Sequence, residues 1–150
     1  MKPTTHNVIG LLSALIICEY FNLPKLEIVS GAMNTAALPD IDLKINLFPH
    51  RGITHSLLIP CLLYISYYLM DGSPKYIILG AIIGLLSHIL SDMLNGKGTE
   101  IFWPSRKNFR VMDIQYNGFI ENLLFKIMTG IIVVLLIGVK NIVFLLEFIK

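Results

Sequence analysis

Long apolar stretches separated by short polar segments dominate the chain. Residues 76–94 are the clearest example, and these 19 positions make a helix of about 28 Å, enough to cross the hydrocarbon core of a bilayer. Further apolar stretches, each expected to be helical, cover residues 7–23, 26–38, 56–70 and 121–150. No alternation of apolar and polar positions is long enough to predict a strand. The pattern therefore predicts an all-α bundle with about four spanning or re-entrant helices.

Helix-breaking residues mark the boundaries between these stretches. Pro24 ends the first stretch, and Pro39 disfavours helical conformation at the residue before it. Residues 26–38 number only 13, fewer than the roughly 20 that a span needs, so they either re-enter or return incompletely. The last stretch would divide at Lys140 and Asn141 into a span and a terminal helix. The predicted connections are a loop over residues 39–51, a turn over 71–74, a stop at 95–98 and a polar loop over 97–118.

Composition supports a membrane protein. Hydrophobic residues make up 55% of the chain and charged residues 15%, with a mean hydropathy of +0.70. Because soluble domains have about 25% charged residues, lipid must solvate much of this surface. The apolar run at residues 8–18 resembles a signal peptide, but Glu19 interrupts it and cleavage would discard His6, so we expect a retained helix. We expect one domain over residues 1–150.

Charge is distributed unevenly between the two ends of the predicted helices. Tracing successive crossings places the N-terminus, residues 39–51 and residues 97–118 on one side, together with all four histidines. The basic residues of that side are Lys2, Lys44, Arg51, Lys97, Arg106, Lys107 and Arg110. The other side holds Lys25, Lys75 and Lys140. The positive-inside rule then predicts a multi-pass protein of the bacterial inner membrane whose histidines face the cytoplasm. The net charge of +2 is too small to predict nucleic-acid binding.

His88 and Asp92 share one helix face because they are four residues apart. Gly80 and Gly84 continue the same row, and a small-residue face of this kind lets another helix approach closely. Ser87 and Ser91 lie beside it. An imidazole and a carboxylate within a spanning helix are unfavourable in lipid and are functional by default. The alternative is a structural hydrogen-bonded pair that joins two helices.

Two further segments carry metal-binding side-chain types. Asp40 and Asp42 are two apart in a region that Pro39 biases toward extended backbone, so that both carboxylates can approach one cation. His50 and His55 follow within a dense polar segment, and His6 lies on a small-residue row of the first helix. The candidate metal ligands are His6, Asp40, Asp42, His50, His55, His88 and Asp92.

This set of imidazoles and carboxylates favours zinc, with manganese or iron as alternatives. Seven candidates exceed one tetrahedral site, so either two ions share a bridging aspartate or some candidates support the ligands or act in proton transfer. A divalent metal would activate water for hydrolysis. We expect Asp42 to take the proton of that water and Arg51 to neutralise charge on a phosphoryl oxygen, a role that Lys97 or Arg106 could also fill.

These motifs, in this order, resemble a family of bacterial inner-membrane-associated metal-dependent hydrolases that includes a LexA-regulated member. The most specific parts are the string His50-Arg51-Gly52-Ile53-Thr54-His55-Ser56 and the downstream pair His88 and Asp92. The resemblance covers residues 5 to about 110. Its other motifs are Thr5-His6, Leu38-Pro39-Asp40-Ile41-Asp42, Gly98 and Trp103-Pro104-x-Arg106.

That family in turn looks like a membrane-embedded relative of the helical fold of zinc phospholipase C and single-strand nucleases. Those enzymes add a later His-x-x-x-Glu helix, whereas this sequence has no histidine after His88; Glu121 could stand in for part of that helix. The resemblance implies a membrane-bound hydrolase of a phosphoester such as a phospholipid headgroup. The alternative is a non-catalytic metal-binding membrane protein that acts as a sensor, transporter or scaffold.

Overall fold

The computed structural model describes residues 1–41 and 52–137, and this part of the chain is helical with no strands. The all-α bundle predicted from the sequence is confirmed. Its α-helices are α1 (Pro3–Phe21), α2 (Lys25–Thr35), α4 (Leu58–Leu69), α5 (Ser73–Met93) and α6 (Phe119–Ile137). Two short 3-10 helices, η1 (Leu38–Ile41) and η2 (Ile53–His55), lie between α2 and α4.

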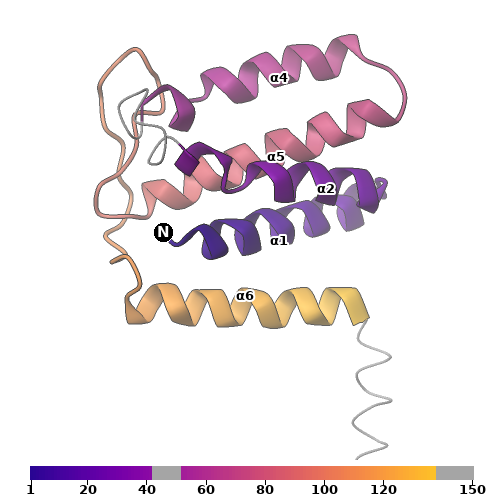
Figure 1. Cartoon of the computed structure of the whole chain (residues 1–150). Helices are drawn as coiled ribbons and strands as arrows, with labels where there is room; N and C mark the ends of the chain where they lie inside the picture. The colour runs from indigo at the N-terminus through magenta and orange to yellow at the C-terminus, as the bar shows by residue number, and fades with distance from the viewer. Residues whose placement is uncertain (42–51, 138–150) are drawn as a thin grey trace, which may run out of the picture.

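Successive helices run in opposite directions, so the chain returns repeatedly to the same two ends of the bundle (Figure 1). One end contains the N-terminus, the last turn of α5 and the first turn of α6, and we call it the histidine end. The turns that join α1 to α2 and α4 to α5 lie at the opposite end. This arrangement agrees with the crossings traced along the sequence.

Proline explains two differences from the predicted boundaries. Helix α1 begins at Pro3 rather than at residue 7, and α5 begins at Ser73, inside the predicted turn over residues 71–74. A proline in the first helical turn lacks only an N–H that has no partner within the helix, and its restricted φ angle suits the helix. Both prolines therefore begin helices, and the second half of the predicted turn is wrong.

Around Pro39 the helix predicted over residues 26–38 is interrupted. Helix α2 ends at Thr35, and η1 occupies the start of the loop predicted over residues 39–51. A 3-10 turn tolerates proline at this position because the ring sets a suitable φ angle. The remainder of that loop, and the predicted division at Lys140 and Asn141, lie outside the described residues.

Small residues hold α2 against α5. A Cβ added at Gly80 would lie 2.1 Å from the carbonyl oxygen of Ile28, and one added at Gly31 would lie 2.1 Å from that of Ile77. Backbones this close leave no room for a methyl group, so the predicted small-residue face on α5 is confirmed. The apolar core continues from this contact to α1 through the buried residues Ala14, Cys18, Ile28, Ala32 and Ile83.

Three of these helices are long and apolar enough to cross a membrane: α1, α5 and α6. Helix α5 lies at the centre, with 56% of its apolar window buried, whereas only 11% of the α6 window is buried. Helix α6 packs mainly against α1 and otherwise exposes apolar side chains such as Ile120 and Ile127. Such a helix needs lipid around it, as the sequence composition predicted.

Candidate metal centre

Three histidines and two aspartates meet at the histidine end, although they come from four different segments. His6 belongs to α1, Asp40 to η1, His55 to η2, and His88 with Asp92 to the last turns of α5. The Nε2 atoms of the three histidines lie 3.3–3.8 Å from carboxylate oxygens of Asp40 and Asp92. The His6 and His88 rings stack with their centroids 3.9 Å apart. We call these five residues the cluster.

A backbone hydrogen bond determines which His88 nitrogen faces the cluster. His88 Nδ1 lies 2.7 Å from the carbonyl oxygen of Ala36. Because a carbonyl can only accept, Nδ1 carries the hydrogen, and in a neutral ring Nε2 then presents a lone pair. Metal-binding histidines are commonly oriented by such a bond from the second nitrogen.

Ser91 imposes the same arrangement on His6. The Ser91 hydroxyl donates its single hydrogen to the carbonyl oxygen of His88, 2.8 Å away. It can therefore only accept from His6 Nδ1, which lies 2.7 Å from it. His6 Nε2, like His88 Nε2, faces the cluster with a lone pair and has no hydrogen-bond partner among the described residues.

A lone pair on Nε2 and a carboxylate oxygen repel each other at these distances, and a metal ion bound between them removes that repulsion. Two ligands bound to one tetrahedral zinc at 2.0–2.1 Å are about 3.3 Å apart, close to the separations within the cluster. One donor atom each from His6, Asp40, His88 and Asp92 can be chosen so that all lie within 4.8 Å of one another. These four residues could hold a metal ion, and His55 lies beside them.

Burial makes the need for a cation stronger. His6, His55 and His88 are fully buried and Asp92 is 1% exposed, while Asp40 is half-buried at the edge of the cluster. Buried carboxylates need paired charge because the interior solvates them poorly. Burial raises the pKa of the Asp40 carboxyl, but the neighbouring imidazoles of His55, His88 and His6 lower that pKa below its ordinary value. The Met1 ammonium is a further cation, 3.4 Å from Asp92 Oδ1.

The structure thus brings together five of the seven candidate ligands. Asp42, His50 and Arg51 lie outside the described residues, so their predicted roles stay predictions. Glu121 does not replace the missing His-x-x-x-Glu helix. Its carboxylate instead accepts hydrogen bonds from the Lys2 and Asn117 amides and the Thr5 hydroxyl, at 2.5, 2.6 and 3.0 Å respectively.

Sequence reasoning missed the groups that orient the imidazoles. Ser91 was visible beside His88 on the helix, but nothing in the sequence pointed to its bond with His6. The carbonyl of Ala36 has no sequence signature at all, because every residue carries one. The Thr99 hydroxyl, which donates to the His55 carbonyl oxygen at 3.2 Å, was likewise not foreseen.

Comparison with known proteins identifies relatives of this chain. The family model described as YdjM inner membrane protein matches residues 1–148. Inner membrane protein YdjM from Escherichia coli (strain K12) and that from Shigella flexneri are each 39% identical over 104 aligned residues, covering 57% of this chain and 53% of the relative. The aligned part thus spans about half the length of those relatives.

A more distant relative aligns over more of the chain. The protein YvsG of Bacillus subtilis (strain 168) is 31% identical over 129 residues, 74% of this chain and 78% of that protein. No solved structure matches the chain. The resemblance to zinc phospholipase C and single-strand nucleases therefore stays a prediction.

Proposed function

The chain belongs to the YdjM inner membrane protein family, and on that premise we propose that it is a multi-pass metal-dependent hydrolase. Its substrate is a phosphoester of a membrane lipid, reached from the cytoplasmic face of the inner membrane. One observation carries this proposal: two imidazoles whose Nε2 lone pairs are set by their other hydrogen bonds converge with His55 on two carboxylates.

A divalent metal held by His6, Asp40, His88 and Asp92 would supply Lewis acidity and lower the pKa of a water molecule. The protein's own contribution is to orient the ligands and to bury the three imidazoles. Among the described residues Asp40 is the partly exposed member of the cluster, and we propose that substrate approaches from its side. Two residues follow Asp40 in the sequence and complete the proposal. Asp42 takes the proton of the water, and Arg51 contacts the phosphoryl group.

A lipid headgroup suits the position of the cluster. The cluster lies near the ends of α1 and α5, two of the helices long enough to span, rather than at their midpoints. Exposed basic side chains of the segment between α5 and α6, among them Arg106, Lys107 and Arg110, share this end of the bundle. Basic residues close to a bilayer surface attract anionic headgroups by about 1 kcal/mol each.

Elemental analysis of the purified protein tests the metal. We expect bound zinc, manganese or iron in the wild type and its loss in the Asp92→Ala variant, because removing one carboxylate leaves the site with excess positive charge. Asp71→Ala, an exposed aspartate at the opposite end, is the matched control and keeps the metal. Metal-free wild-type protein would overturn the metal centre.

Turnover tests the reaction. The wild type in mixed micelles should release phosphate or a headgroup from phosphatidylglycerol, and a chelator should abolish the release. Asp92→Ala should be inactive and Asp71→Ala fully active. Metal that is bound without any turnover of phospholipid would contradict the hydrolase and support a non-catalytic sensor, transporter or scaffold.

A further inference from the structure

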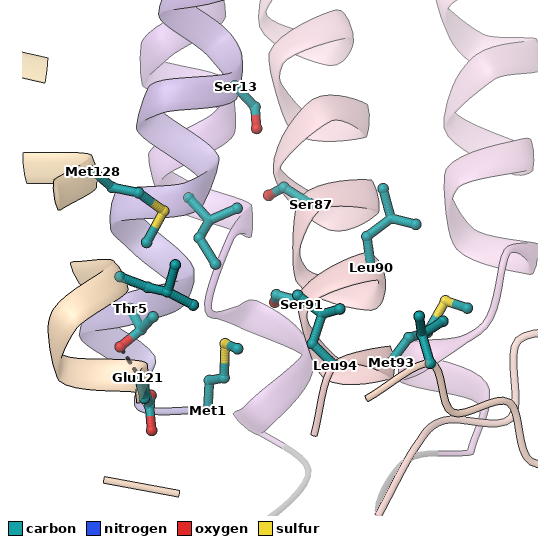
Figure 2. Close-up of a pocket in the computed structure, with 13 residues that line it drawn as sticks. Met1, Thr5, Ser13, Ser87, Leu90, Ser91, Met93, Leu94, Glu121 and Met128 are labelled. Carbon is teal, nitrogen blue, oxygen red and sulfur yellow. Dashed lines mark hydrogen bonds between the residues drawn. The ribbon is translucent and has the colours of Figure 1, made fainter. Parts of the chain in front are cut away.

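A cavity of about 420 Å³ lies between α1, α5 and α6 (Figure 2). Its walls include Ile9 of α1, Leu90 and Leu94 of α5, and Leu124 and Met128 of α6. The volume is within the range of 300–1,000 Å³ that is typical of small-molecule sites. We call it the groove.

Four of the polar residues that line the groove, Thr5, Ser87, Ser91 and Glu121, already have partners. Ser87 and Ser91 donate their hydroxyl hydrogens to carbonyls of their own helix, those of Gly84 and His88. Thr5 donates to Glu121 (Figure 2), and the Glu121 carboxylate also accepts two backbone N–H groups. The groove therefore offers a new ligand an apolar wall, which suits a hydrocarbon chain and not an ion pathway.

The groove is reached from the lipid. All three candidate spans line it, so it lies at membrane depth. Leu90 on its wall is 60% exposed, and α6 packs mainly against α1, which leaves the side of α5 that carries Leu90 uncovered. An apolar molecule entering from that side comes from the surrounding bilayer.

One end of the groove is lined by two residues that contact the cluster. Ser91 lines the groove and accepts the hydrogen bond of His6 Nδ1. Met1 also lines it, and the Met1 nitrogen lies 3.4 Å from Asp92 Oδ1. A chain held in the groove would therefore end in a headgroup beside the ligands proposed for the metal.

We propose that the groove binds one acyl chain of a bilayer phospholipid and thereby presents the phosphoester of that lipid to the cluster. The presentation step rests on the proposed hydrolase function, whereas occupancy of the groove does not. The substrate class is accordingly a lipid drawn sideways from the membrane, and a water-soluble phosphoester with no acyl chain is a poor substrate.

Photolabelling of the full-length protein tests the occupancy. The probe is phosphatidylglycerol with a diazirine on one acyl chain, in vesicles of phosphatidylethanolamine and phosphatidylglycerol. We expect crosslinks on peptides that contain Ile9, Leu90 or Leu94. Met128→Trp fills the groove and should lower those crosslinks about tenfold, because excluding roughly two CH₂ groups of the chain, at about 0.8 kcal/mol each, has about that effect.

Ile127→Trp is the matched control, since it puts the same side chain on the exposed face of α6, where Ile127 is 52% exposed. It should leave the groove crosslinks unchanged. Leu124→Phe obstructs the groove less and should also lower these crosslinks. It provides the test if Met128→Trp fails to fold. Equal crosslinking of the groove peptides in wild type, Met128→Trp and Leu124→Phe would overturn the proposal.

The labelling is repeated after chelation, because an apolar groove needs no metal to hold a chain. Groove crosslinks in a metal-loaded wild type that shows no phospholipid turnover would support the groove and refute the hydrolase. Phospholipid turnover that is unchanged by Met128→Trp would refute presentation of the substrate by the groove and leave the hydrolase standing.

Discussion

At the scale of single residues, two hydrogen bonds decide what the histidine end can bind. The carbonyl of Ala36 and the hydroxyl of Ser91 both hold the hydrogen of an imidazole on Nδ1. Each bond leaves Nε2 as an acceptor that faces Asp40 and Asp92. A site whose imidazole acceptors face carboxylates discriminates against hydrogen-bonding ligands and favours a cation.

Replacing Ser91 with alanine tests this orientation. The change removes the acceptor of His6 Nδ1 without touching a proposed ligand atom. Loss of such an orienting partner weakens metal binding by about 10- to 100-fold. Competition with a chelator of known affinity measures the change.

Ser66→Ala is the matched control, because the Ser66 hydroxyl also donates to a carbonyl of its own helix, that of Leu62, but on the exposed side of α4. It should leave metal affinity unchanged. Wild-type affinity in Ser91→Ala would show that the His6 ring does not depend on this bond.

At the scale of elements, two contacts hold the bundle together around α5. Gly80 and Gly84 let α2 pack closely against α5, and this brings the carbonyl of Ala36, at the end of α2, to His88. On the other side Glu121, in the first turn of α6, accepts bonds from Lys2 and Thr5 and so fastens α6 to the start of α1. The same two contacts place His6 and Asp40 within reach of α5.

Gly80→Ala should destabilise the protein. The new Cβ would lie 2.1 Å from the Ile28 carbonyl oxygen, so α2 must move away. Overpacking of this kind costs about 1–3 kcal/mol. Gly130→Ala is the matched control because a Cβ there meets nothing within 4 Å, and its better helix propensity should add up to about 1 kcal/mol. Thermal unfolding in detergent distinguishes the two, and equal melting temperatures would contradict the close packing.

Glu121→Gln should loosen α6. The amide group of glutamine replaces one acceptor oxygen with a donor, so one N–H or hydroxyl group loses its partner. Hydrogen bonds to a charged group contribute about 1.5–3 kcal/mol. Glu19→Gln removes an exposed ion pair with Lys25 and should change stability by less than about 1 kcal/mol. Unfolding curves that are identical for Glu121→Gln and the wild type would refute the anchoring role.

At the scale of the whole molecule, the alternating helices separate two chemically different ends. The histidine end carries the cluster and the basic segment between α5 and α6, and the opposite end carries the turns with Lys25 and Lys75. The positive-inside rule then predicts an orientation with the cluster toward the cytoplasm. Orientation decides which pool of metal and water the proposed hydrolase uses.

Cysteine labelling tests the orientation. In a Cys61→Ser background, with Cys18 buried, Asp71→Cys should react with a membrane-impermeant maleimide in intact cells whose outer membrane is permeabilised. Ser105→Cys, in the basic segment, should react only after lysis. Both positions are exposed, so access to the bulk solvent does not bias the comparison. The reverse pattern would place the cluster on the periplasmic side.

Much of the fold follows from local rules and is therefore visible in the sequence. Every predicted apolar stretch contains a helix, because apolar runs of that length can satisfy their backbone in lipid only as helices. The pairing of His88 with Asp92 on one face also follows from the 3.6-residue repeat. Three of the boundary errors fall near Pro3, Pro39 and Pro74, because proline permits either a helix start or an interruption.

What only the tertiary structure decides is how distant segments meet. Ala36 orients His88 from 52 positions away, Ser91 meets His6 across 85 positions, and Glu121 joins Lys2 across 119. In the sequence, nothing about a backbone carbonyl indicates its partner. A glutamate that binds a metal also cannot be distinguished in the sequence from one that joins two helices. The sequence by itself therefore determined the helices and five of the side chains that gather at one end, whereas through-space packing decided which nitrogen each histidine presents and that Glu121 stays apart.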